Sequence, residues 1–178
     1  MPYVLPVLLL AAATALILSA MYRSWRRRAR GVVVTDLPAL PAGSPAAPAD
    51  PPVEGVYVST TIAGRPWERV LAQGLGARSA VDIQVLPARA GLPGGVLLTR
   101  RGARDVFIPA GTIHDVHRAS GMIGKVVDTD GLVVITWQVG ETLLDTGLRT
   151  RYGADRARLH DRIHSLLVAT GENANPEG

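Results

Sequence analysis

Residues 130–149 read DGLVVITWQVGETLLDTGLR, and this pattern predicts two antiparallel strands joined by a tight turn. Asp130-Gly131 is a turn signal, and the run from Leu132 to Gln138 is the most apolar strand pattern in the chain, rich in β-branched residues. Val139-Gly140 then turns the chain into a second strand, Glu141–Arg149. These residues predict a largely β fold.

Shorter apolar or alternating runs precede this pair, and turn residues separate them. They predict strands at Val56–Thr60, Arg78–Leu86, Gly95–Arg100, Asp105–Pro109 and Ile113–Ala119, with a hairpin turn at Arg101–Arg104 and a connection at Gly121–Val127. One stretch has a different period, because Trp67, Val70 and Leu71 are spaced as on a helix. We therefore expect a short helix within Ala63–Gly74.

Residues 154–169 have the apolar periodicity of an amphipathic helix. The apolar stripe comprises Leu159, Ile163, Leu166 and Leu167. Gly171 is expected to end the helix, and residues 171–178 to form a disordered polar tail. About seven strands followed by one helix predict a mainly β domain at residues 53–170, in which the C-terminal α-helix plugs one open end of a bent antiparallel sheet, as in pleckstrin-homology (PH)-like barrels.

The N-terminal region predicts a membrane anchor. An uncharged run from Tyr3 to Tyr22 is long enough, at ~1.5 Å per residue in a helix, to cross the ~30 Å hydrocarbon core of a bilayer. Five arginines follow it at once: Arg23, Arg26, Arg27, Arg28 and Arg30. Because such a basic flank stays in the cytoplasm, we expect a transmembrane helix at 1–22 with its N-terminus outside, a basic juxtamembrane segment at 23–34, and a C-terminal domain on the cytoplasmic side of the inner (cytoplasmic) membrane.

Two alternatives to the anchor stay open, a cleaved signal peptide and a buried helix of a soluble protein. A signal peptide carries its positive charge before the apolar run and needs small residues at its cleavage site. Here the arginines follow the run, and Leu18 stands two residues before Ala20, where a small residue is needed. The order of charge therefore favours the anchor.

Residues 35–52 form a linker rich in Pro and Ala. Proline disfavours helix and favours extended geometry at ~3 Å per residue, so the linker has a reach of up to ~50 Å. We expect it to act as a spacer between the anchor and the domain.

Charge is distributed unevenly along the chain. Residues 1–30 hold five of the nineteen basic residues and none of the fifteen acidic residues, so residues 31–178 carry fourteen and fifteen, a net charge of −1. The overall charge of +4 is thus a signal of membrane topology, and it argues against nucleic acid as a partner. The chain has no cysteine, which excludes disulfides and thiolate metal sites.

Five segments of the chain carry a resemblance to a known family. They are Val53–Thr61, Ile108-Pro109-Ala110, Gly121–Lys125, Asp130–Trp137 and Leu144–Arg149. Together they resemble an actinobacterial family of single-span membrane proteins with a cytoplasmic PH-like domain, whose members are often labelled export proteins or transporters and are encoded among pyrimidine-biosynthesis genes. The resemblance covers residues 53–168 and the anchor, and it implies no catalytic signature. A single span does not form a translocation path by itself.

Two groups of histidines have some of the features of a metal or catalytic site. His160 and His164 have the i, i+4 spacing of helical metal ligands, but the sequence shows no third ligand. On the strand Ile113–Ala119, alternation places Ile113, Asp115 and His117 on one face, so Asp115 and His117 can pair. A catalytic triad would still lack its nucleophile.

Two aspartate motifs resemble parts of known functional sites. Asp128-Thr129-Asp130-Gly131 resembles the start of a calcium loop but lacks the glutamate that closes one. Asp145-Thr146-Gly147 is a single copy of a motif that aspartic proteases need twice. The sequence therefore predicts no catalytic residue, no metal site and no cofactor.

Arg100, Arg101 and Arg104 form one basic patch at the predicted hairpin tip, and they are candidate contacts for an anionic lipid or a partner. Trp67 and Trp137 are expected to pack in the core. The sequence thus predicts a non-enzymatic adaptor that the bilayer anchors and that binds a protein partner or an anionic lipid. The gene association implied by the resemblance makes a pyrimidine-biosynthesis enzyme a candidate partner. An accessory subunit of a membrane transport or export complex and a membrane-tethered enzyme of unknown reaction are the alternatives.

Overall fold

The computed structural model describes residues 13–19, 37–40, 50–89, 93–122, 125–126 and 131–174. The chain divides into two units, Met1–Val33 and Val34–Gly178. In the first unit residues 13–19 are helical and exposed. The remainder of the predicted span at 1–22 and the five juxtamembrane arginines lie outside the described residues. No helix within the described ranges is both long enough and apolar enough to cross a bilayer.

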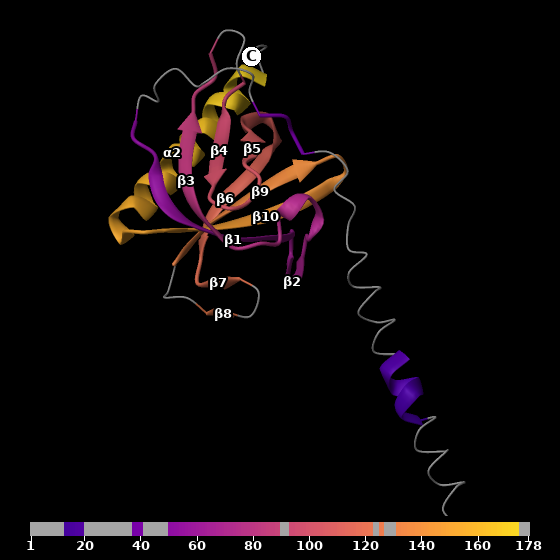
Figure 1. Cartoon of the computed structure of the whole chain (residues 1–178). Helices are drawn as coiled ribbons and strands as arrows, with labels where there is room; N and C mark the ends of the chain where they lie inside the picture. Colours follow the sequence, from indigo (N-terminus) through magenta and orange to yellow (C-terminus); the bar gives the residue numbers. More distant parts are fainter. Residues whose placement is uncertain are drawn as a thin grey trace, which may run out of the picture. The chain divides into compact units, whose positions relative to one another are not determined.

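The second unit is built on an antiparallel sheet (Figure 1). Its strands are β1 (Val53–Ile62), β2 (Arg65–Arg69), β3 (Ser79–Leu86), β4 (Gly95–Arg100), β5 (Val106–Pro109), β6 (Ile113–Ala119), β9 (Leu132–Val139) and β10 (Thr142–Thr150). The strand order is β5-β4-β3-β1-β10-β9-β6, and β2 pairs with β1. The short strands β7 (Gly121–Met122) and β8 (Lys125–Val126) pair with each other. The predicted mainly β architecture is confirmed.

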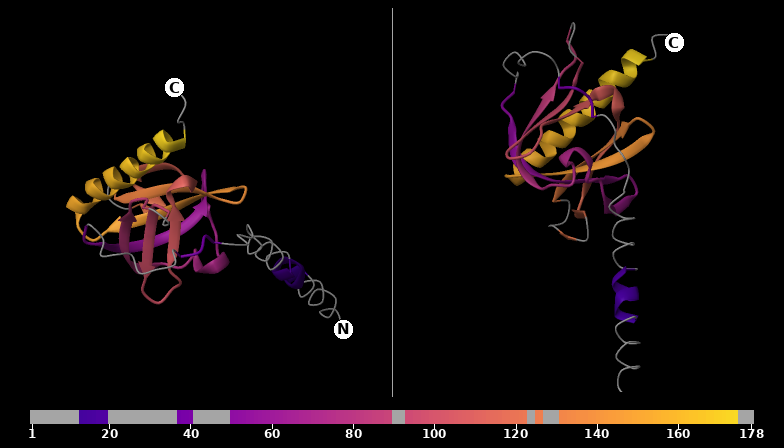
Figure 2. Two further views of the ribbon diagram at one scale, coloured as in Figure 1. Left: turned by 90° about the horizontal axis from the view of Figure 1, so that it is seen from above. Right: turned by 45° about the vertical axis from the view of Figure 1, so that its right-hand side comes forward.

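The C-terminal helix covers the place where the sheet ends. The outermost strands, β5 and β6, are joined by the short 3-10 helix η2 (Ala110–Thr112), and α2 (Gly153–Ala174) packs against β6, η2, β9 and β10. Figure 2 shows α2, in yellow, lying across the bent sheet. The residues it buries are Leu159, Ile163 and Leu166, as the apolar stripe predicts. The helix continues to Ala174, beyond the end predicted at Gly171.

The core is centred on β9, which lies between β10 and β6. Its fully buried side chains are Leu132, Val133, Ile135 and Trp137. The prediction that Trp137 packs in the core is confirmed. Burial removes these apolar side chains from water, which stabilises the domain.

The helix predicted within Ala63–Gly74 is wrong. The segment instead forms β2 and then the 3-10 helix η1 (Ala72–Gly74). Between the pairs Thr61–Arg69 and Ile62–Arg65, β1 advances by one residue while β2 advances by four, so residues 66–68 bulge out of the ladder. Pro66 has no N–H to donate to a ladder, and this accounts for an irregular strand at that position.

The predicted phase of the strand Ile113–Ala119 is also wrong at its start. A register shift between Ile113 and Asp115 breaks the alternation. Ile113 and Val116 are buried, whereas Asp115 and His117 are exposed. Ile113 therefore does not share a face with the other two, because a bulge moves every later side chain by one position.

Candidate binding surface

The structure separates the three arginines of the predicted basic patch. The side chain of Arg100 is 4% exposed, at the end of β4. Its Nε donates to Ser79 Oγ at 2.9 Å, its Nη2 to the Ala77 carbonyl at 2.6 Å, and its Nη1 to the carbonyls of Gly74 and Arg104 at 3.1 and 3.4 Å. Arg100 is thus enclosed by protein acceptors, and the expectation that it forms part of an exposed patch is wrong.

The guanidinium of Arg100 also lies over the ring of Tyr57, 3.9 Å from the ring centroid. Tyr57 is fully buried. Burial raises the pKa of Tyr57 to about 12, because it disfavours the phenolate; the hydrogen bond from Thr60 and the charge of Arg100 act in the opposite direction. Burial likewise lowers the pKa of Arg100. The pair therefore consists of a neutral phenol and a cation held against its ring.

A chain of buried hydrogen bonds runs from the core to the Tyr57 hydroxyl. Trp137 Nε1 donates to Thr146 Oγ1 at 2.9 Å, and Tyr57 Oη donates to the Leu75 carbonyl at 2.8 Å. Between them, Thr146 and Thr60 are 2.7 Å apart and Thr60 and Tyr57 2.6 Å apart, oxygen to oxygen. Since each hydroxyl has one proton, Thr60 must donate to Tyr57, and Thr146 to Thr60. All donors in the chain point the same way.

This network joins two loops into one unit. Arg100 holds the carbonyl of Gly74 in one loop and that of Arg104 in the other. Near the surface, Arg104 Nη1 donates to Gln73 Oε1 at 2.8 Å. Gln73 has a left-handed backbone (φ 55°), a strained geometry that persists where its surroundings hold it in place. We call residues 63–78 together with 101–105 the loop platform.

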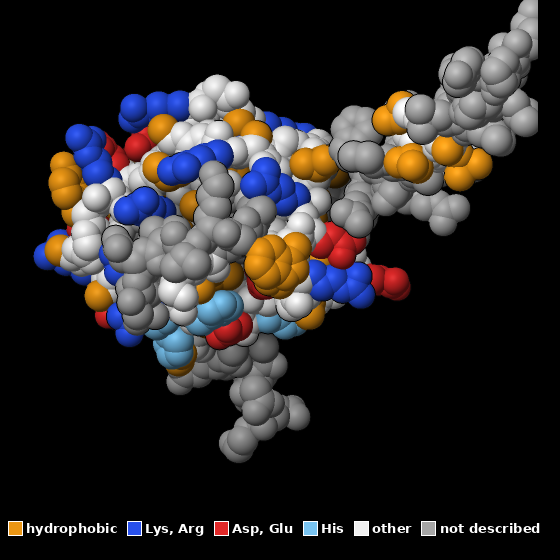
Figure 3. Space-filling view, turned by 90° about the horizontal axis from the view of Figure 1, so that it is seen from below, with side chains coloured by type: hydrophobic (Ala, Val, Ile, Leu, Met, Phe, Trp, Pro, Cys, Tyr) orange, Lys and Arg blue, Asp and Glu red, His pale blue; other side chains and the backbone are white. Residues whose placement is uncertain are grey.

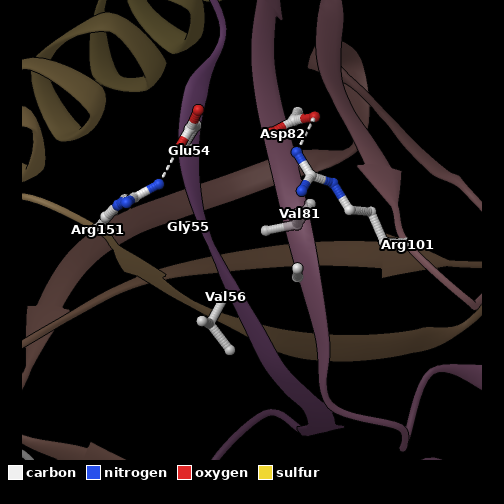
Figure 4. Close-up of a pocket in the computed structure, with 8 residues that line it drawn as sticks. Glu54, Gly55, Val56, Val81, Asp82, Arg101 and Arg151 are labelled. Carbon is white, nitrogen blue, oxygen red and sulfur yellow. Dashed lines mark hydrogen bonds and ion pairs between the residues drawn. The ribbon is translucent and has the colours of Figure 1, made fainter.

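Arg101 projects from the platform toward a hollow of about 180 Å³ over the paired strands β1 and β3 (Figure 4). Its Nη2 lies 3.4 Å from Asp82 Oδ2, and on the other side Arg151 Nη1 lies 2.6 Å from Glu54 Oε2. Glu54 and Asp82 are directly opposed on the two strands. Each carboxylate is thus matched by one arginine, so the four side chains carry no net charge. The hydrogen bond to Glu54 raises the pKa of Arg151.

The histidines make local pairs. His117 Nδ1 lies 2.9 Å from Asp115 Oδ2, which confirms that these two residues can pair, and His114 Nε2 lies 2.9 Å from Gln138 Oε1. On α2 the rings of His160 and His164 stack with centroids 6.2 Å apart. No group of three metal-ligating side chains occurs within the part of the chain that the structure describes.

The structure describes one of the two aspartate motifs in full. Asp145 lies within β10 and accepts a hydrogen bond from Thr136 Oγ1 at 2.7 Å, so its carboxylate supports the sheet. Thr146 of the same motif belongs to the buried chain. Residues 128–130 of the calcium-like motif lie outside the described residues.

Sequence reasoning missed the most exposed aromatic side chain of the platform. Trp67 is 73% exposed and Leu71 60% exposed, so the expectation that Trp67 packs in the core is wrong. Helical spacing misled the prediction, and Pro66 was the signal that pointed to an irregular strand. Figure 3 shows basic side chains spread over one face of the molecule with hydrophobic side chains exposed between them.

Comparison with known proteins gives one match. A family model described as Bacterial PH domain-like matches residues 34–165. No curated protein and no solved structure matches the chain significantly. The match spans most of the chain and includes every strand of the sheet. The chain therefore belongs to the bacterial PH domain-like family.

Proposed function

We propose that this protein is a membrane-tethered binding module. Its N-terminal apolar run and arginines anchor it in the cytoplasmic membrane, its Pro/Ala-rich linker sets its reach, and its PH-like domain holds a partner beside the bilayer on the cytoplasmic side without catalysing a reaction. The order of charge supports the orientation. Membership of a PH-like family supports a binding role.

The observation that carries the proposal is the rigid loop platform. Binding sites are commonly loops positioned by a rigid scaffold. Here the buried guanidinium of Arg100 and the buried hydroxyl of Tyr57 fix the loop carbonyls of Gly74, Ala77 and Leu75. Exposed Trp67 on β2 and exposed Leu71 just after β2 belong to the same platform, and exposed apolar groups that lie together mark interaction surfaces.

The binding role is tested by site-specific photo-crosslinking in cells that produce the full chain. One variant carries a photoreactive phenylalanine derivative at Leu71, and the matched control carries it at Val168 on α2, which is 57% exposed. We expect an adduct, with either a phospholipid or a protein, from position 71 and none from position 168. Equal labelling at both positions, or no adduct at either, would contradict a platform-specific partner.

The orientation is tested separately with a reporter that is active only outside the cytoplasm, fused after residue 178. We expect it to be inactive, and we expect substitution of the five juxtamembrane arginines by glutamine to give a mixed orientation. The control removes five exposed arginines of the domain: Arg78, Arg89, Arg101, Arg151 and Arg158. These should not affect orientation, because charge counts within about 15–20 residues of a span. An active reporter on the unmodified chain would refute the topology.

A further inference from the structure

The bulge of β2 has an unusual combination of exposure and support. Trp67 stands at its centre and is 73% exposed, between two residues, Arg65 and Arg69, that pair with β1. The next exposed apolar side chain, Leu71, follows directly after Val70, which is buried and whose N–H donates to the Thr60 carbonyl at 2.9 Å. The exposed residues are thus interleaved with residues that fix the backbone.

The backbone of the segment that carries Leu71 is held at both ends. Leu75 is fully buried, its carbonyl accepts the Tyr57 hydroxyl, and the same carbonyl accepts the Thr60 N–H at 3.0 Å. Val70 and Leu75 therefore hold both ends of the segment that carries Leu71. Contact with water is unfavourable for the apolar side chains of Trp67 and Leu71, so a surface that covers them would lower the free energy.

Most of the net positive charge of the domain lies on this segment. Residues 63–78 contain three arginines, Arg65, Arg69 and Arg78, and one acidic residue, Glu68. Arg65 Nη1 lies 3.3 Å from Glu68 Oε2 in an exposed pair. The segment thus carries a net charge of +2, out of +3 for the domain at residues 53–170, which has fourteen basic and eleven acidic residues. Arg104 of the neighbouring turn adds a further cation beside Gln73.

We infer that the β2 bulge is a bilayer-contact element: Trp67 and Leu71 enter the headgroup region of an anionic phospholipid bilayer, and Arg65 and Arg69 meet its phosphates. Tryptophan favours the membrane–water interface, where its ring is partly buried and its N–H stays hydrated. Arginine binds phosphate oxygens with two parallel hydrogen bonds. This inference rests on the proposed function, because the tether keeps the domain close to the lipid surface.

The contact can be measured by fluorescence on the full chain reconstituted into vesicles. Trp25 lies next to the predicted span, so both samples carry Trp25→Phe. The emission then comes from Trp67 and from the fully buried Trp137. Brominated phosphatidylcholine quenches a tryptophan that enters the bilayer. We expect quenching in vesicles of equal parts phosphatidylglycerol and phosphatidylcholine, weaker quenching in phosphatidylcholine alone, and none above the Trp137 background after Trp67→Phe.

Charge variants test the role of the arginines. Each arginine near an anionic surface favours the contact by roughly fivefold, so the double variant Arg65→Gln/Arg69→Gln should reduce it by more than about tenfold in the anionic vesicles. The matched control, Arg151→Gln/Arg158→Gln, removes the same charge from elsewhere on the domain and should leave quenching unchanged. Circular dichroism checks that each variant keeps its sheet.

Flotation of the vesicles separates this inference from the proposed function. A chain that does not float with the vesicles overturns the proposed tether, and the bilayer contact with it. A chain that floats, but whose Trp67 stays open to iodide in water and is not quenched by brominated lipid, overturns the bilayer contact alone. Equal loss of quenching in the two double variants would overturn the role of Arg65 and Arg69. A Leu71 photo-adduct with a protein, together with absent lipid quenching, would assign the bulge to a protein partner instead.

Discussion

Substitution of Thr146 by valine should destabilise the domain strongly for a change of so few atoms. Thr146 Oγ1 accepts from Trp137 Nε1 and donates to Thr60 Oγ1, and all three side chains are fully buried. Valine has nearly the same shape, so packing is retained. The substitution leaves the indole N–H without an acceptor, at a cost of about 1–3 kcal/mol, and removes a second bond worth about 1 kcal/mol.

The extra methyl group recovers less than about 1 kcal/mol of this, since one buried CH₂-sized group contributes about 0.8 kcal/mol. We therefore expect Thr146→Val to lose about 1–3 kcal/mol of unfolding free energy. For a domain of this size, that lowers Tm by roughly 3–12 °C. Thermal unfolding followed by the β-sheet circular dichroism signal of the full chain in detergent micelles measures it.

Thr99→Val is the matched control, because Thr99 is an exposed strand residue of β4 and should stay within about 0.5 kcal/mol of the unmodified chain. The double variant Thr60→Val/Thr146→Val should lose less than the sum of the two single losses, since neighbours in one hydrogen-bonded chain are coupled. If the Tm of Thr146→Val lies within about 1 °C of that of the unmodified protein, the buried series of hydrogen bonds does not stabilise the domain.

Three further predictions concern the same region. Arg100→Lys should lower the free energy of unfolding by about 3–5 kcal/mol, because an ammonium group does not reproduce the hydrogen bonds that the guanidinium donates to several acceptors. Amide hydrogen exchange of residues 74–78 should therefore accelerate. Tyr57 has its folded pKa raised to about 12 from 10.0, so its contribution to stability is complete below pH 10 and is lost as pH rises through 12. Urea titrations at several alkaline pH values should show a stability difference between the unmodified chain and Tyr57→Phe that shrinks over this window by up to about 2–3 kcal/mol; a constant difference would contradict it. Gly55→Ala should cost about 1–3 kcal/mol in thermal unfolding, because its Cβ would lie 2.5 Å from the Arg149 carbonyl oxygen, whereas Gly111→Ala, in open space, should be neutral.

The regular strands could be predicted because their burial follows directly from residue type. Gly95–Arg100 and Ile113–Ala119 have the predicted bounds, and the stripe on α2 is buried as its 3.6-residue period requires. Such patterns are local. Predictions from them fail where one extra residue enters a strand pairing, as between Ile113 and Asp115, because the apolar alternation of the residues before a bulge does not reveal it.

The loop platform could not be predicted for a different reason. Arg100 reads as the first residue of a solvated turn, and its burial depends on carbonyls of residues 74–77, more than twenty positions earlier in the chain. The exposure of Trp67 depends on a pairing irregularity between β1 and β2. Both are set by tertiary contacts, which override residue preference.

The placement of α2 has a consequence for synthesis on the ribosome. β1 pairs with β10, so the centre of the sheet closes only after about ninety further residues have been made, and contacts so distant in sequence form slowly. Until residues 153–166 emerge, the parts of β6, η2, β9 and β10 against which α2 packs have no cover, and exposed apolar surface of this kind recruits other chains. A chain truncated before residue 153 should therefore aggregate or be retained by chaperones, while a chain that ends after residue 169 should fold into a protected domain. Whether the partly made domain is protected from aggregation therefore depends on α2, the last element to be translated.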